Sequence, residues 1–122
     1  MEPYIDGFVH PIPTNRLDSY RQLAEAAAVI WKEHGALEYR EFVGDDLYLE
    51  GTRSFCDATV ASDDCCVIFG WVAFSSRKSR DEVNTKVASD PRMHALVENS
   101  ASGFDAAKML YGGFKSLFSP ED

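Results

Sequence analysis

The chain has 122 residues, of which 45% are hydrophobic and 26% are charged, and its formal net charge is −8 at pH 7. This length suffices for one hydrophobic core, and the composition is that of an ordinary globular domain. The negative charge argues against a nucleic-acid or membrane partner, because both attract basic surfaces. No apolar run approaches the ~20 residues that span a bilayer. No leader-like segment opens the sequence, so we expect a cytoplasmic protein.

Cysteine and histidine positions argue against a disulfide framework and against a metal site. There are three cysteines, an odd number, and Cys65 and Cys66 are adjacent, so reduced thiols are expected. His10, His34 and His94 do not stand at ligand spacing, and no cysteine joins them. We therefore expect no metal, no haem and no other cofactor.

The chain begins with a predicted strand over Tyr4–Val9. Large apolar residues occur at both parities, which indicates a strand covered on both faces. Pro11 and Pro13 are expected to end this strand. The next polar residues, Thr14 or Asn15, are expected to cap a helix.

A helix is predicted over Leu17–His34, because its apolar residues recur at helical spacing. Gly35 stands at the position that follows a helix C-terminus, and a second strand is predicted over Leu37–Val43. The polar stretch after it is expected to form a long connection, with a short edge strand near Arg53–Thr59.

The second half of the chain repeats the order strand, helix, strand. Val67–Phe74 is the most apolar run and is expected to be a central strand. Helices are predicted over Ser76–Asp90 and, after an Asp-Pro start signal, over Arg92–Val97. The last strand is predicted over Met109–Phe114.

A doubled strand-helix-strand unit in so short a chain predicts an α+β, ferredoxin-like β-α-β-β-α-β fold. We expect one such domain over residues 1–118 and a frayed end at 119–122. Helices cover one face of such a sheet, yet large apolar residues such as Phe69 and Val72 stand at both parities. An uncovered apolar face marks an interface, so we expect a symmetric homodimer with the two sheets packed face to face.

Separated blocks spread over nearly the whole chain match a known family pattern. The blocks are Tyr4–Val9, Trp31–Glu41, Gly44–Asp46, Ser76-Arg77, Arg80-Asp81, Asn84, Lys86-Val87, Asp90–Arg92 and Tyr111–Phe114. They resemble the YbaA-like family, small uncharacterised bacterial proteins of the dimeric α/β-barrel superfamily. The resemblance implies a ferredoxin-like protomer whose sheet pairs with that of a second copy to form the barrel.

The wider superfamily includes cofactor-free monooxygenases, lactone isomerases, haem-degrading enzymes and stress proteins. Fold kinship therefore does not select a reaction. The segment 100–108 departs from the family pattern, since Ser102 and Gly103 precede Phe104 where Met-Pro is usual. No binding role is assigned to that segment.

Four residues are the candidates for catalysis, namely Asp6, Glu38, Tyr39 and Arg40. A carboxylate in an apolar strand is costly unless it is paired, so Asp6 or Glu38 is a candidate general base. Arg40 or Tyr39 would stabilise developing charge. The alternative is an ion pair that sets the sheet register or bridges the dimer, and such structural pairs are common.

Three aromatic residues, Trp31, Trp71 and Tyr111, are expected to wall a ligand pocket between the sheet and its helices. The alternative is that they are ordinary core residues. The basic residues Arg77, Lys78 and Arg80 are interpreted as a solvated turn rather than a phosphate site.

Two functions follow from these residues. The first is the binding of a small apolar or aromatic molecule, with cofactor-free oxidation or isomerisation as the chemistry if the protein is an enzyme. The second is a non-enzymatic, stress-associated or structural homodimer that holds no ligand.

Overall fold

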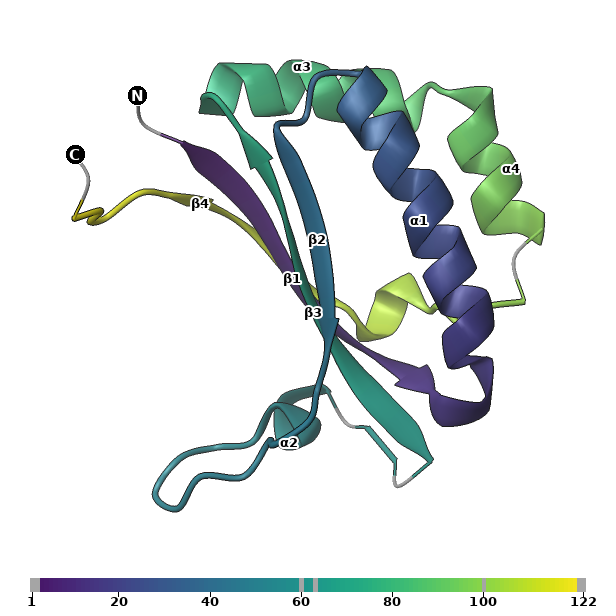
Figure 1. The fold of residues 1–122 in the computed structure, drawn as a ribbon, viewed down its shortest axis with the longest axis vertical. Coiled ribbons are helices and arrows are strands. Elements are labelled where there is room, and N and C mark those ends of the chain that lie inside the picture. Colours follow the sequence, from purple (N-terminus) through teal and green to yellow (C-terminus); the bar gives the residue numbers. More distant parts are fainter. Residues whose placement is uncertain (1–2, 60, 63, 100, 121–122) are drawn as a thin grey trace.

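The computed structural model describes residues 3–59, 61–62, 64–99 and 101–120, and it contains one four-stranded antiparallel sheet (Figure 1). The strands are β1 (Tyr4–Pro13), β2 (Glu38–Val43), β3 (Cys65–Phe74) and β4 (Leu110–Lys115), in the order β2-β3-β1-β4. The helices are α1 (Leu17–Glu33), α2 (Phe55–Thr59), α3 (Arg77–Ala88) and α4 (Pro91–Asn99). This order confirms the ferredoxin-like α+β plan, with α2 and α4 added to it.

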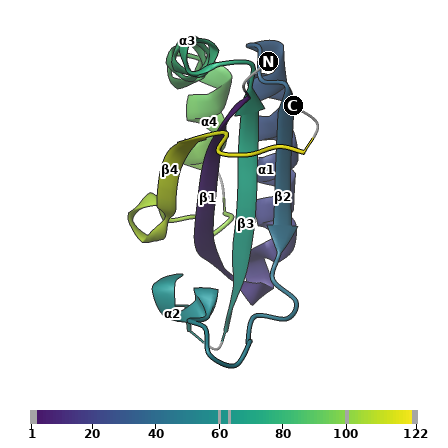
Figure 2. The same ribbon diagram turned by 90° about the vertical axis from the view of Figure 1, so that its left-hand side faces the viewer.

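Helices α1, α3 and α4 lie on one side of the sheet, and the other face of the strands is largely bare (Figure 1, Figure 2). The strand register fixes which residues face each side. Asp6 pairs with the buried Val72, so the even-numbered residues of β1 and β3 share the helix-covered face. Tyr39 also pairs with Val72, so the odd-numbered residues of β2 share that face.

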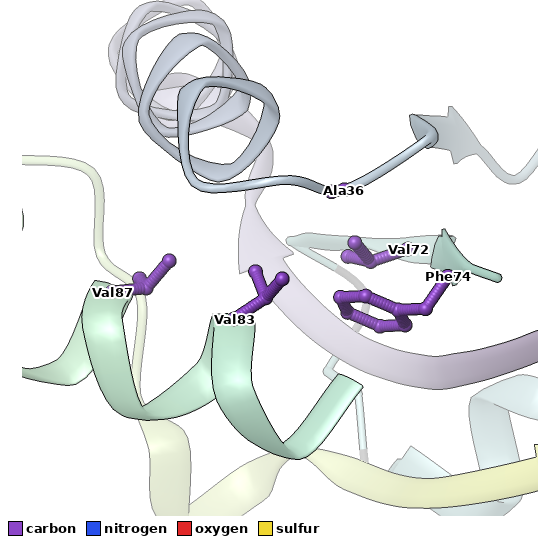
Figure 3. Packing of buried hydrophobic residues seen from close by; sticks show 5 residues of the cluster. All are labelled: Ala36, Val72, Phe74, Val83 and Val87. Atoms are coloured by element: carbon purple, nitrogen blue, oxygen red, sulfur yellow. The ribbon is translucent and has the colours of Figure 1, made fainter. Parts of the chain in front are cut away.

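The core lies between the sheet and the helices. One cluster combines Val72 and Phe74 of β3 with Val83 and Val87 of α3 and with Ala36 (Figure 3). Phe74 is fully buried, and burial of such a side chain contributes about 1.5–3 kcal/mol. A second cluster, formed by Ile12, Tyr20 and Ile68, joins α1 to the far end of β1 and β3.

The prediction that Pro11 and Pro13 end the first strand is wrong, because β1 continues to Pro13 and pairs with β3 throughout. Strand β4 pairs with β1 only as far as Val9, so beyond that residue no other strand of the described ranges pairs with this edge of β1. The backbone N–H of Thr14 donates a hydrogen bond to the backbone carbonyl of Asp64, which lies on the β3 side of β1. The preceding proline nitrogen therefore faces the free edge, where proline is tolerated.

The predicted edge strand over Arg53–Thr59 is also wrong, because α2 occupies most of this range. The Ser54 hydroxyl accepts a hydrogen bond from the Cys56 N–H at 3.1 Å, as an N-cap does. Phe55 then packs edge to face on Phe69, on the side of the sheet that the other helices leave bare.

Helix α1 begins differently from the prediction and ends as predicted. A 3₁₀ turn over Thr14–Arg16 precedes it, and no side chain caps its first turn. At its end, Gly35 has a φ of 120°, a conformation that glycine adopts without strain. Its N–H donates to the carbonyl of Lys32.

None of the helices in the described ranges combines the length and the apolar character that a bilayer crossing requires. Cys56, Cys65 and Cys66 are free thiols. Strand β4 ends at Lys115, and two residues of the predicted frayed end, 121 and 122, lie outside the described residues.

Candidate functional site

A cavity of about 210 Å³ lies between the helix-covered face of the sheet and helices α1 and α4. The helices contribute an apolar wall, formed by Leu23, Ala24, Ala27, Trp31, Met93 and Val97. The strands contribute most of the polar groups. The polar side chains that reach the cavity are Asp6, Tyr20, Tyr39, Glu41 and Tyr111.

The floor of the cavity follows from the register of the sheet. Glu41 on β2 lies opposite Gly70 on β3, and Gly70 lies opposite Phe8 on β1. A Cβ atom on Gly70 would approach the Phe8 ring to 2.5 Å. Glycine at this position therefore lets the Phe8 ring extend over β3 toward the strand that carries Glu41.

Glu41 is the centre of a hydrogen-bonded cluster drawn from three elements. Tyr39 donates its hydroxyl hydrogen to Glu41 Oε2 at 2.7 Å, and Tyr20 of α1 donates to Oε1. The His10 Nε2 atom lies 3.0 Å from the Tyr20 oxygen. Because the single Tyr20 hydrogen goes to Glu41, the His10 nitrogen is the donor in that pair.

Burial sets the charge states of this cluster. It raises the pKa of the Glu41 carboxyl, and the hydrogen bonds from Tyr20 and Tyr39 oppose that rise. Burial and the nearby Glu41 charge also raise the pKa of both tyrosine hydroxyls, so each phenol keeps its hydrogen. The pKa of His10 is lowered by burial to about 4, which keeps its imidazole neutral at neutral pH.

Asp6 forms a second cluster with α3. Its carboxylate accepts hydrogen bonds from Arg80 Nε at 2.9 Å and from Asn84 Nδ2 at 3.2 Å. The side chains of Asp6 and Arg80 are 3% and 15% exposed, so the ion pair is buried. Arg80 also donates to the Tyr111 hydroxyl at 3.4 Å. A Cβ atom at Gly113 would lie 2.6 Å from Arg80 Nη2, so glycine makes room for the guanidinium.

A third polar cluster joins the end of α1 to the start of α4. Asp90 accepts a hydrogen bond from the N–H of Arg92 at 2.8 Å and therefore caps α4 as predicted. His34 Nε2 lies 2.7 Å from Asp90 Oδ2, and Arg92 reaches back to Glu33. The Arg92 guanidinium and then His34 hold the pKa of Asp90 well below its usual range. This cluster lies outside the cavity and joins two helices.

Asp6 and Tyr39 were predicted as catalytic candidates, and Trp31 and Tyr111 as pocket walls; all four line the cavity. Asp6, whose face the sequence leaves open, is on the helix-covered side. Its partner is Arg80 and not Arg40.

The structure does not bring the other three predicted residues to the cavity. Glu38 and Arg40 have the opposite parity on β2 from Tyr39, so they lie on the bare face, where Arg40 donates to Glu38. Trp71 has the opposite parity from Val72 and lies beside Phe42 on that same bare face. It therefore cannot share a pocket wall with Trp31.

Sequence reasoning missed Glu41, Tyr20, Phe104 and Arg80. Glu41 has the same parity as Tyr39, and this spacing is the signal that would have found it. For Arg80 the signal is that it stands three residues before Val83, on the face of α3 that enters the core. The interpretation of residues 77–80 as a solvated turn is thus wrong for Arg80. Phe104 lines the cavity, although the sequence assigns no binding role to segment 100–108.

Two carboxylates face the cavity, and they differ in their partners. Asp6 forms an ion pair with Arg80, whereas no ion pair within the described ranges involves Glu41. Glu41 is therefore the group best placed to accept a proton from a bound molecule. Across the residues that the structure describes, no three His, Cys, Asp or Glu side chains gather as metal ligands do.

Comparison with known proteins identifies the family. A model of the family described as "Protein of unknown function (DUF1428)" matches residues 3–106. The chain belongs to the DUF1428 family. Uncharacterized protein YbaA of Escherichia coli K12 is 39% identical to this DUF1428 chain over 114 residues, which cover 93% of the chain and 96% of YbaA. The YbaA protein of Shigella flexneri gives the same values.

Solved structures support the fold of this DUF1428 chain. A NIPSNAP family protein of unknown function from Agrobacterium tumefaciens matches with a TM-score of 0.59 and 17% identity, over 97% of this chain and 92% of that one. A dimeric ferredoxin-like protein from an uncultured marine organism matches with a TM-score of 0.54 and 10% identity, over 96% and 98%. At these identities the likeness concerns the fold alone.

Proposed function

We propose that this DUF1428 protein binds a small apolar or aromatic molecule in the cavity between its sheet and helices α1 and α4. The observation that carries the proposal is the cavity itself, at about 210 Å³. An apolar cavity of about 150 Å³ holds benzene, and drug-sized ligands occupy about 300 Å³ or more. The volume therefore suits a molecule of one or two rings.

The lining also supports this proposal over the alternative of a ligand-free homodimer. A cavity lined by Trp31, Met93 and Val97 offers dispersion contacts to an apolar guest. The hydroxyls of Tyr20 and Tyr39 and the Glu41 carboxylate add a few fixed polar groups. Apolar walls with few convergent polar groups are typical of small-molecule sites.

Filling the cavity from α1 should abolish binding of a two-ring probe. Ala27 is buried and lines the cavity, so in Ala27→Phe the new ring occupies the space of the probe. Calorimetric titration with indole should show saturable binding to the wild type. Binding to the variant should be weaker by about tenfold or more.

The matched control is Ala95→Phe, which makes the same change at an exposed position of α4. This control should bind indole as the wild type does. Circular dichroism verifies that both variants are folded. Absence of saturable indole binding to the wild type, or equal binding by Ala27→Phe, would contradict the proposal.

We further propose that the bare face of the sheet pairs with a second copy of the chain. Large apolar side chains are 43–56% exposed on this face, namely Phe42, Phe69, Leu110 and Phe114. Three of them, Phe69, Leu110 and Phe114, border a trough of about 550 Å³ along the strands. Exposed apolar surface of this extent is typical of an interface, and a symmetric pairing of two such faces would bury it.

A charge in the middle of this face should break the dimer. We expect the wild type to sediment at twice the protomer mass at micromolar concentration. Phe69→Glu should weaken association by about a hundredfold or more, because the symmetric contact desolvates two added carboxylates. Val29→Glu is the control, since Val29 is 56% exposed on α1, on the other side of the molecule. A wild type that sediments as a monomer would rule the pairing out.

A further inference from the structure

The charges in the cavity do not balance. The Asp6 carboxylate is compensated by Arg80 at 2.9 Å. Glu41 is partly buried, and no cationic side chain in the described part of the chain lies within ion-pair distance of it. A carboxylate that loses hydration without gaining a cation is destabilised, so an incoming cation at Glu41 would relieve that cost.

The hydrogen bonds around Glu41 leave room for such a cation. An ionised carboxylate accepts about four hydrogen bonds, and Glu41 accepts one from Tyr20 and one from Tyr39. Each oxygen therefore keeps an acceptor position, and Glu41 forms part of the cavity lining. Both phenol hydrogens are already directed to Glu41, so neither is available to an anionic ligand.

The rest of the lining fits a cation that carries an apolar body. Aromatic faces attract cations, and the cavity is lined by Phe8, Tyr20, Trp31, Tyr39, Phe104 and Tyr111. Asp6 lies two strands away from Glu41 and two residues further along the sheet, which places their Cα atoms roughly 12 Å apart. A single ammonium group therefore meets Glu41 and not the neutralised Asp6.

We propose that the ligand of this cavity is an organic monocation, with an apolar or aromatic body held between the sheet and helices α1 and α4 and an ammonium group bound to Glu41. This inference rests on the proposed binding function and names its ligand class. It requires no covalent step.

Three probes that carry the same phenyl ring separate this ligand class from its competitors. 2-Phenylethylamine carries an ammonium group at pH 7, 2-phenylethanol is its neutral counterpart, and 3-phenylpropanoate is an anion with the same ring. Calorimetric titration of the wild type should show the amine binding about tenfold or more tighter than the alcohol. The anion should bind more weakly than either.

The variant Glu41→Gln removes the charge and keeps an oxygen for a tyrosine hydroxyl. Its preference for the amine over the alcohol should fall to about twofold or less. Glu25→Gln is the matched control, because it removes one carboxylate from an exposed position of α1. This control should retain the full preference for the amine.

The outcomes distinguish the two proposals. Saturable binding of the alcohol without a preference for the amine would overturn the monocation and leave the cavity proposal standing. So would a preference that survives in Glu41→Gln. If Glu41→Gln fails to fold, tight binding of 3-phenylpropanoate by the wild type would overturn the monocation by itself. Binding of none of the three probes would contradict the cavity proposal.

Discussion

Arg80→Met should lower the free energy of unfolding by about 3–5 kcal/mol. This is the usual cost of leaving one member of a buried ion pair without its partner. Asp6 is 2% exposed and depends on Arg80 for its only ionic contact in the described ranges. Chemical denaturation monitored by circular dichroism measures the change.

Two variants test whether the cost arises from the unpaired charge. Adding Asp6→Asn to Arg80→Met removes the buried charge and keeps an acceptor for the Asn84 amide, so it should recover most of the loss. Arg77→Met removes a guanidinium that is 72% exposed on the same helix and should cost less than about 0.5 kcal/mol. A loss below about 1 kcal/mol in Arg80→Met would show that the ion pair does not support the fold.

Stability should fall as the pH is lowered from 7 to 4 because of His10. Its imidazole is 1% exposed, and burial lowers its pKa from 6.5 to about 4. Between these values the unfolded chain binds a proton that the folded chain refuses, so protonation favours unfolding. A shift of this size corresponds to about 3 kcal/mol, present above pH 6.5 and lost by pH 4.

The variant His10→Gln isolates this effect from the carboxylates that titrate nearby. It cannot be protonated in this range, so its stability should fall by about 3 kcal/mol less than that of the wild type between pH 7 and 4. The reference is the difference in unfolding free energy between the wild type and His10→Gln at pH 8, where His10 is neutral in both the folded and the unfolded wild type. If the stability of the two proteins depended equally on pH, His10 would bind its proton as readily in the folded chain as in the unfolded chain.

The strand and helix pattern of the sequence predicted the fold because each half alternates between period 2 and period 3.6. Errors arose where long-range pairing decides the local structure. Pro11 and Pro13 break strands in general, yet they lie in β1 because one edge of that strand is free there. The segment Phe55–Thr59 is a helix whose first turn is capped by Ser54 and whose Phe55 ring packs on Phe69, and the sequence alone does not show that contact.

The sequence identified only some of the residues that line the cavity, and the cause is again long-range pairing. Spacing along β2 shows that Glu38 and Arg40 share one face and that Tyr39 and Glu41 share the other, but it does not say which face the helices cover. The helix-covered face became known only from the pairing of Tyr39 with the buried Val72. Similarly, the partner of Asp6 lies 74 residues away on α3, and packing brings the two together.

A crystal structure of the protein with 2-phenylethylamine would locate the probe and so decide whether the cavity holds an organic cation. We expect the ring between Trp31 and the sheet, within the cavity that α1 and α4 help to line, and the nitrogen at hydrogen-bond distance from Glu41. A ring in the cavity with its nitrogen elsewhere would contradict the monocation alone. An empty cavity at saturating probe, or a probe bound only in the trough on the bare face, would contradict the proposed function.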